Sequence, residues 1–93
     1  MKGILLKMST KFICRCCGYK TLYEEPYGTY EICPVCRWED DPVQTEDPNF
    51  EGGANKESLS TARENFKKFG AKSKDALGKI RKPFPDEIPA EKE

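Results

Sequence analysis

Hydrophobic positions in the second half of the chain recur at the spacing of one helix face. From residue 56 onward the repeating positions are Leu59, Ala62, Phe66 and Phe69. Residues three and four apart lie on the same side of an α-helix, so this pattern predicts an amphipathic helix with one apolar stripe. Asn55 or Ser58 can cap its start, and Gly70 stands where a helix commonly ends.

A second, shorter helix is predicted from Ser73 to about Ile80. Its pattern is weaker, because Gly78 costs such a helix about 1 kcal/mol relative to alanine. Prolines at positions 83, 85 and 89 then oppose regular structure, so residues 83–93 are expected to form a loose tail. Residues 1–10 are expected to be a flexible N-terminus.

The segment TLYEEPYGTYEI, which begins at Thr21, predicts a β-hairpin. Strand-forming residues lie on both sides of EPYG, where Pro26 and Gly28 suit a turn. After the turn, Tyr30 and Ile32 alternate with polar residues, as in a strand with one apolar face.

Charge is distributed unevenly, although its formal sum is zero. Residues 38–55 are a predicted loop, rich in Asp, Pro, Asn and Gly, with six acidic side chains and no basic one. Pro42 and Pro48 are incompatible with a helix interior there. Residues 56–82 carry nine basic and three acidic side chains. Overall neutrality removes the usual reason to expect non-specific nucleic-acid binding.

Four of the five cysteines fall into two closely spaced pairs. The pairs are Cys14 with Cys17 and Cys33 with Cys36, in the pattern C-x2-C-x15-C-x2-C. A two-residue spacer lets both sulfurs of one turn, or knuckle, point at the same ion. The spacing therefore predicts a closed, tetrahedral four-thiolate metal site. Zinc is the expected ion, and a single iron is the alternative for the same ligands.

Cys16 is the cysteine left over. One interpretation makes it an alternate ligand beside Cys17, or a redox-sensitive thiol stabilised by Arg15 and Lys20. A small side chain packed against the knuckle is the simpler interpretation, since most free cysteines are packing residues.

Hydrophobic content is low, at 37% of 93 residues, with 34% charged. So small a core is predicted to need a metal to hold it together. We expect one zinc-stabilised α+β domain over residues 11–82. A zinc-ribbon-like β-hairpin with both knuckles would occupy residues 11–37. The acidic loop, 38–55, and the amphipathic helix with its short companion, 56–82, would follow.

The N-terminal region has an apolar run of only three residues, Ile4–Leu6. This run is too short for a signal peptide or a membrane span. We therefore expect a cytoplasmic protein with no membrane association. In that compartment cysteines stay reduced and more often bind metal than form disulfides.

Acidic residues directly after the second knuckle are a further candidate site. Trp38 precedes Glu39, Asp40 and Asp41, whose carboxylates suit a second, hard metal ion, an acid–base pair or a partner surface. A solvated loop with Trp38 packed over the metal site is the simpler interpretation, since groups for catalysis are largely missing.

Three basic residues, Lys56, Arg63 and Lys67, share one face of the predicted amphipathic helix. They can meet the acidic loop of their own chain or an acidic partner. The self-contained or merely solvated interpretation is favoured, because the chain is neutral and no aromatic residue is interleaved with these cations.

Three motifs together resemble a known family. They are CRCCGYKTL, YEICPVCRWEDDPVQ and GGANKESLSTARENFKKFGA. In this order they resemble the bacterial Cys-rich CPCC family over most of residues 12–72, with Arg15 where that family has proline. The resemblance implies a cysteine-bound metal. The first knuckle also resembles that of rubredoxin. The second knuckle differs, because Arg37 stands where rubredoxin has glycine.

Three functional hypotheses follow from these patterns. The first is a non-enzymatic adaptor that binds a protein, with an antidote to a toxin as one form. The second is a nucleic-acid-binding zinc ribbon. The third is a redox protein that uses iron or the Cys16–Cys17 pair.

Overall fold

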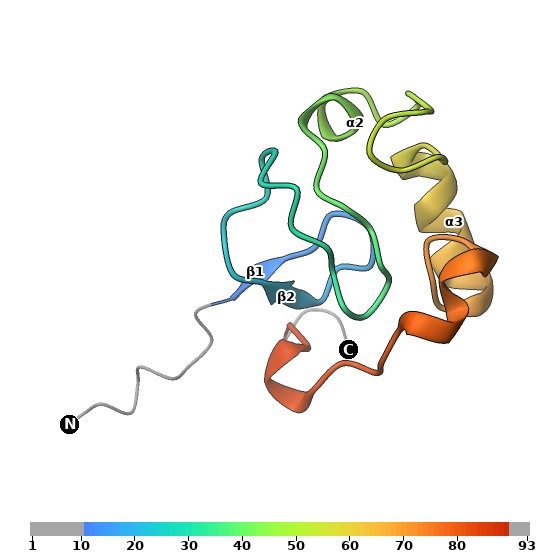
Figure 1. Ribbon diagram of the computed structural model, residues 1–93. Coiled ribbons are helices and arrows are strands. Elements are labelled where there is room, and N and C mark those ends of the chain that lie inside the picture. Colours follow the sequence, from blue (N-terminus) through green and yellow to red (C-terminus); the bar gives the residue numbers. More distant parts are fainter. Residues whose placement is uncertain (1–10, 90–93) are drawn as a thin grey trace.

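Residues 11–89, the part of the chain that this computed structural model describes, contain two short strands, two α-helices and two 3-10 helices joined by loops (Figure 1). In chain order they are β1 (Phe12–Ile13), β2 (Lys20–Leu22), α2 (Pro42–Glu46), α3 (Leu59–Phe69), η1 (Lys74–Lys79) and η2 (Pro85–Glu87). An antiparallel hairpin comes first and helices follow, which confirms the predicted small α+β fold. The expectations for residues 1–10 and 90–93 lie outside the described residues.

The hairpin surrounds the first knuckle and not the EPYG turn. Phe12 pairs with Leu22 and Ile13 with Lys20, with an irregularity between the two pairs. The predicted strand after EPYG is therefore wrong. Tyr30 has a φ of 62°, which lies outside the range of a β-strand and interrupts extended structure at that point.

A side chain replaces the missing strand pairing. The Glu31 carboxylate accepts hydrogen bonds from the backbone N–H groups of Tyr23 at 2.8 Å and Glu24 at 3.2 Å. Ile32 pairs instead with Glu39, in an isolated bridge across the second knuckle. Each cysteine pair therefore lies between two short extended segments that pair with each other.

The amphipathic helix α3 begins and ends where the sequence predicts. The Ser58 hydroxyl accepts a hydrogen bond from the Thr61 N–H at 3.1 Å, and Gly70 ends the helix with a φ of 91°. Leu59 and Ala62 are 1% and 0% exposed, so the predicted stripe faces the core. Of the two candidate caps, the structure uses Ser58.

Replacing Ser58 with alanine is expected to lower the free energy of unfolding by about 1 kcal/mol, because the Thr61 N–H loses its acceptor. Ser60 offers a matched control in the first turn of α3, since no described hydrogen bond uses its hydroxyl. Urea denaturation of Ser58→Ala and Ser60→Ala measures the difference. Equal losses in the two variants would contradict the capping role.

The acidic segment 38–55, predicted as a loop, contains the short helix α2. The Asp41 carboxylate accepts hydrogen bonds from the N–H groups of Val43 at 2.7 Å and Gln44 at 3.2 Å. Pro42 occupies the first turn, where its missing N–H leaves no bond unmade. Proline excludes a helix interior but not a helix start, which is the reason for the correction.

Two buried amides fix the rest of this segment. Gln44 Nε2 donates to the carbonyl oxygens of Phe50, Asn55 and Glu57 at 3.1, 3.0 and 3.0 Å. Asn55 Nδ2 donates to the Glu39 carbonyl at 2.8 Å, and Asn55 Oδ1 accepts from the Glu39 N–H at 2.9 Å. Both amide side chains are 0% exposed. These bonds therefore hold the end of the segment, at Asn55, against its beginning, at Glu39, just after the second knuckle.

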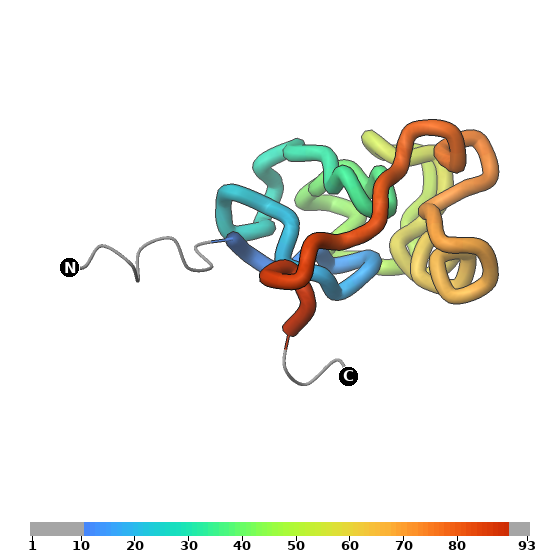
Figure 2. Tube along the Cα trace, turned by 90° about the horizontal axis from the view of Figure 1, so that it is seen from below, coloured from blue at the N-terminus to red at the C-terminus, as the bar shows by residue number. Residues whose placement is uncertain are grey.

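The chain after α3 turns back across the knuckles toward the hairpin (Figure 2). The predicted second helix takes the tighter 3-10 form of η1 over Lys74–Lys79. The Arg81 N–H then donates to the Pro34 carbonyl at 3.1 Å, which ties this segment to the second knuckle. Further along, η2 contacts β2. The C-terminal segment thus closes the domain beneath the hairpin, as Figure 1 shows.

Glu87 holds this closing segment, so the predicted loose tail is wrong for residues 83–89. Its side chain is 0% exposed and accepts two hydrogen bonds from Arg81, both at 2.9 Å. Lys11 Nζ and the Phe84 N–H each donate at 2.8 Å. Prolines at positions 83, 85 and 89 forbid long helices and strands but allow the single turn of η2.

Half of the buried core residues are cysteines. Its buried members are Cys14, Cys16, Cys17, Leu22, Cys33, Val35, Cys36, Trp38, Leu59 and Ala62, with Tyr19 and Phe66 packed against them. Few of these side chains are large, so sulfur occupies the centre that aliphatic groups fill in other small domains. Within residues 11–89, no helix combines the length and apolar character that crossing a bilayer requires.

Candidate metal centre

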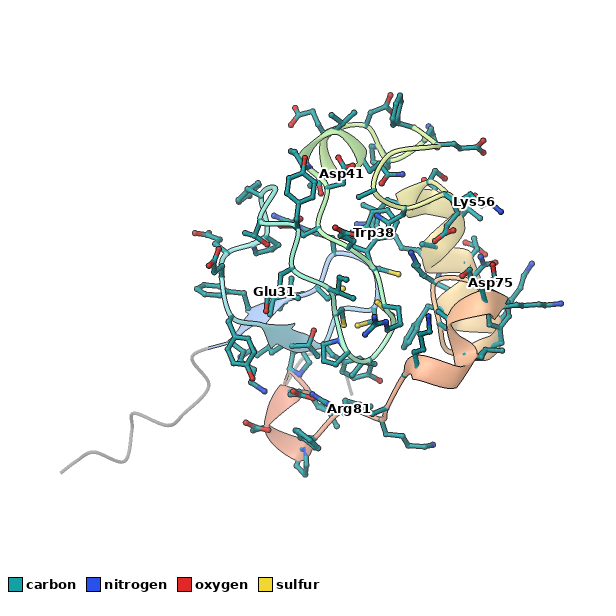
Figure 3. The ribbon with its side chains drawn as sticks, viewed as in Figure 1. Glu31, Trp38, Asp41, Lys56, Asp75 and Arg81 are labelled. Carbon is teal, nitrogen blue, oxygen red and sulfur yellow. The ribbon has the colours of Figure 1, made fainter. Side chains whose placement is uncertain are left out.

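Two knuckles bring four sulfur atoms together at the centre of the molecule (Figure 3). Cys14 and Cys17 come from the loop between β1 and β2, and Cys33 and Cys36 from the loop inside the Ile32–Glu39 bridge. Residues Gly18 and Arg37, each directly after a knuckle, have φ values of 82° and 75°, which turn the chain back toward its partner segment.

The four sulfur atoms have the spacing of a tetrahedral thiolate site. Cys14 Sγ lies 3.6 Å from Cys36 Sγ, Cys17 Sγ lies 3.7 Å from Cys33 Sγ, and all four lie within 4.8 Å of one another. Metal–sulfur bonds of about 2.3 Å place the sulfurs of a tetrahedron about 3.8 Å apart. Exposures of 1%, 4%, 0% and 0% remove the cluster from water. Four buried cysteines are therefore arranged to bind one metal ion.

Donors around the sulfurs favour their deprotonated form. The backbone N–H groups of Cys16, Val35 and Trp38 each approach the sulfur two residues earlier at 3.4 Å. The Thr21 hydroxyl lies 2.9 Å from Cys33 Sγ. Such donors disperse the negative charge that four thiolates leave on a divalent ion, and they fix the orientation of each ligand.

Contacts among the clustered sulfurs shift their pKa values in opposite directions. The hydrogen bond with Cys14, followed by those with Cys17 and Cys36, lowers the pKa of Cys33. Contact with Cys14 is also the first cause that raises the pKa values of Cys17 and Cys36. Metal binding must displace the protons that remain, so affinity is expected to fall as the pH falls.

Replacing Thr21 with valine is expected to weaken metal affinity by about tenfold, because Cys33 loses its hydroxyl donor. Thr45→Val is the matched control, since the buried Thr45 hydroxyl has no hydrogen-bond partner among the described residues. Competition with a chromophoric chelator measures both affinities. An unchanged affinity in Thr21→Val, or an equal loss in Thr45→Val, would contradict a ligand-supporting role.

Cys16 lies beside the cluster but is not one of the four grouped sulfurs. Its side chain is 8% exposed, and its thiol is among the contacts that raise the pKa of Cys36. Its backbone N–H donates a hydrogen bond to Cys14 Sγ at 3.4 Å. This placement agrees with a packing role, and its suggested alternate-ligand or redox role stays a prediction.

The acidic residues after the second knuckle are internal and do not form a partner surface. Trp38, Asp40 and Asp41 are 1%, 1% and 5% exposed. Asp40 Oδ2 accepts from the N–H groups of Gly28 and Thr29 at 2.9 and 2.8 Å. Backbone folding thus uses these carboxylates, which corrects their suggested role in partner binding.

Asp41 illustrates how the fold keeps such an acid charged. Burial alone would raise its pKa, but hydrogen bonds from the N–H groups of Ala54, Gln44 and Val43 outweigh burial and lower the pKa. Its two oxygens thus serve both α2 and the turn at Ala54. Trp38, by contrast, packs in the cysteine core, as its simpler interpretation predicts.

Of the three cations predicted to share a helix face, Arg63 and Lys67 lie on α3, whereas Lys56 precedes the helix and lines a hollow together with Glu39 of the acidic segment. Arg63 Nε donates to the Arg15 carbonyl in the first knuckle at 2.9 Å. Lys67 has only Glu64 nearby, at 3.9 Å, and Lys56 lines a shallow hollow beside Lys72. Among the described ion pairs, none joins these three cations to residues 38–55, and all three residues are exposed.

The fold and the site together define a small α+β protein with a four-cysteine metal-binding centre. The chain belongs to the Cys-rich CPCC family: the sequence model described as Cysteine-rich CPCC matches residues 12–87. That range covers both knuckles, α3 and the buried Glu87, and it extends past the three motifs that carry the resemblance. No curated protein matches the chain.

Proposed function

We propose that this protein binds one zinc ion in the cytoplasm and acts as a non-enzymatic module that binds another protein. The observation that carries the proposal is the enclosure of the four sulfurs, each at most 4% exposed. Thiolates are soft ligands that suit zinc, and four of them fill a tetrahedral coordination sphere. Such a sphere has no open position for a water or a substrate, so the ion would stabilise the fold.

The metal content of untagged protein, purified from its own host, tests the zinc proposal. We expect one zinc per chain and a colourless sample. Chelation should then abolish the cooperative melt, since zinc binding supplies folding energy. A red sample with one iron per chain would instead support the rubredoxin-like alternative. A metal-free sample with an unchanged melt would contradict both.

Exposed apolar side chains support a role in protein binding. Within residues 11–89, the large hydrophobic residues that are at least 50% exposed are Tyr23, Tyr27, Tyr30, Val43 and Phe84. Aromatic side chains are enriched in the centres of protein interfaces. Crosslinking in the host, followed by mass spectrometry, should recover a stoichiometric protein partner. Recovery of none, together with a monomer in solution, would contradict the binding role.

Nucleic-acid binding is a second candidate, favoured by cations that lie over exposed tyrosines. The Arg15 guanidinium is 4.9 Å from the ring centre of Tyr27, and Lys11 Nζ is 5.4 Å from that of Tyr23. Aromatic and basic residues in this arrangement can stack bases and neutralise phosphates. This candidate predicts salt-dependent binding of single-stranded RNA that is weakened by Tyr27→Ala.

A further inference from the structure

A groove of about 400 Å³ lies between the end of α3, the second knuckle and the returning C-terminal segment. Its lining residues are largely apolar: Tyr19, Val35, Phe66, Phe69, Ile80 and Pro83, with Gly70, Arg81 and Lys82 beside them. Phe66 and Phe69 belong to the apolar stripe of α3, but the core leaves both of them half-buried. The groove therefore offers an apolar surface that the chain itself only partly covers.

A second hollow, of about 280 Å³, adjoins the groove at Phe66. It lies between α3 and the first knuckle. Its lining includes Arg15, Arg63 and Lys67, together with Cys16, Cys17 and Gly18 of the knuckle. We call the groove and this hollow together the α3 surface. Phe66 is shared by both parts, so one ligand can contact both.

The charged side chains that line the α3 surface, apart from the buried metal ligand Cys17, are all cations. Arg15, Arg63, Lys67, Arg81 and Lys82 line it, and none of the described lining residues is acidic. This excess of one sign contrasts with the zero formal charge of the whole chain.

Nearby acids do not cancel these charges. Glu87 pairs with Arg81, but it also pairs with Lys11, so one buried carboxylate faces two cations. Glu64 lies 3.9 Å from Lys67, where both side chains are more than 60% exposed and such a pair is weak. Four thiolates around a divalent ion would add two negative charges behind Cys17, against five lining cations. The α3 surface therefore stays positive.

We propose that the α3 surface binds an acidic protein segment that carries an apolar side chain, an inference that rests on the proposed protein-binding function. The apolar side chain would enter the groove between Phe66 and Ile80. Carboxylates on either side would meet the cations at Arg63 and Lys67 on one flank and at Lys82 on the other. Apolar contact supplies affinity, while opposite charge steers the encounter and selects the partner.

Two other occupants fit this surface less well. Residues 1–10 include apolar side chains, but they carry two lysines and no acid, so their charge is of the wrong sign. A single-stranded nucleic acid needs ring faces on which bases can stack. Here the Tyr19 and Phe66 rings pack edge to face on each other, with centres 6.1 Å apart and planes at 73°.

Binding of synthetic probes to the full-length, metal-loaded protein tests the inference. The probes are a fluorescein-labelled acidic peptide with a central Leu-Trp pair, the same peptide with lysine for every acid, the acidic peptide with Ser-Ser at its centre, and a labelled single-stranded RNA. Fluorescence anisotropy at low salt should rank the first peptide at least about tenfold above each of the others. Tighter binding of the RNA, or no binding of the first peptide, would overturn the inference.

Paired variants locate the binding site. Lys67→Glu should weaken binding of the acidic peptide by about tenfold. Lys68→Glu is the matched control and should leave binding nearly unchanged, because it changes the net charge equally, on the same helix, at an exposed position outside the α3 surface. Phe69→Ala should weaken binding of the acidic peptide similarly. Its control is Leu77→Ala, which should leave binding nearly unchanged, because the Leu77 side chain lies 42% exposed on η1, outside the α3 surface. Thermal melts check that each variant is folded. Equal effects within both pairs would overturn the inference.

The same variants separate this inference from the proposed function. If a protein partner is recovered from the host and Lys67→Glu and Lys68→Glu bind it equally well, the α3 surface is not the interface, but the binding function stands. If no partner is recovered and no peptide binds, both this inference and the proposed binding function are contradicted.

Discussion

Replacing Cys14 with serine is expected to abolish both metal binding and the cooperative melt. The remaining three sulfurs would lie in a site from which water is largely excluded, since Cys17, Cys33 and Cys36 are at most 4% exposed. Structural four-ligand sites contribute on the order of 10 kcal/mol of binding free energy to folding. A core with so few large aliphatic side chains cannot replace that amount.

Cys16→Ser is the matched control for this prediction. It removes a neighbouring buried thiol of the same knuckle that is not one of the four grouped sulfurs. We expect it to keep one metal ion and a cooperative melt. Circular dichroism melts and metal analysis of both variants decide the outcome. A metal-free Cys14→Ser variant with an unchanged midpoint would contradict the account, as would loss of metal in Cys16→Ser.

Glu87→Gln is expected to lower the free energy of unfolding by about 3 kcal/mol at neutral pH, the amount that a pKa lowered from 4.5 to about 2 implies. The two hydrogen bonds from Arg81 outweigh the cost of burial, and Lys11 and the Phe84 N–H add to them, so the pKa of Glu87 falls to about 2. Removing one partner of a buried pair usually costs more. Here Lys11 and Arg81 are 19% and 32% exposed, so both can turn toward water.

The pH dependence of this loss follows from the lowered pKa. An acid whose pKa is lower in the folded than in the unfolded state stabilises the fold above its ordinary pKa of 4.5, and this contribution disappears as the pH falls toward about 2. The gap between wild type and Glu87→Gln should therefore be full at pH 7 and close between about pH 5 and 2.

The difference in unfolding free energy between wild type and Glu87→Gln isolates the contribution of Glu87, because acid is expected to remove the metal ion from both proteins alike. Chemical denaturation across this pH range measures it. Asp86→Asn controls for the loss of one exposed negative charge next to Glu87. A gap that stays constant with pH, or an equal loss in Asp86→Asn, would contradict the role assigned to Glu87.

Local patterns in the sequence were sufficient for part of this structure. The spacing of Leu59, Ala62 and Phe66 and the cap at Ser58 locate α3, because each depends only on neighbours within a turn or two. The two C-x2-C pairs locate the sulfur cluster for a similar reason, since each knuckle is a local turn whose two sulfurs suit coordination of the same ion.

The pairing of strands was harder to predict, because backbone conformation at single residues decides it. Tyr30, with φ at 62°, interrupts a segment whose alternation is typical of a strand. The helix α2 was missed although its signal was present, since Asp41 before Pro42 is a good helix start. Burial of that cap, together with Asp40, could not be read from a segment so rich in acid.

The buried carboxylate of Glu87 depends on contacts that no local pattern contains. Its partner Lys11 lies 76 residues away, and the three prolines around it suggest disorder when they are read alone. The α3 surface is also a product of tertiary structure. Its cations come from the first knuckle, from α3 and from the returning C-terminal segment, and only the fold brings them to one side.

X-ray absorption at the metal edge of protein purified from its own host tests the central claim most directly, because it reports the atoms bound to the ion. We predict one zinc per chain with a single shell of four sulfurs at about 2.3 Å. A shell that contains oxygen or nitrogen, or sulfurs joined to each other without an ion, would contradict it.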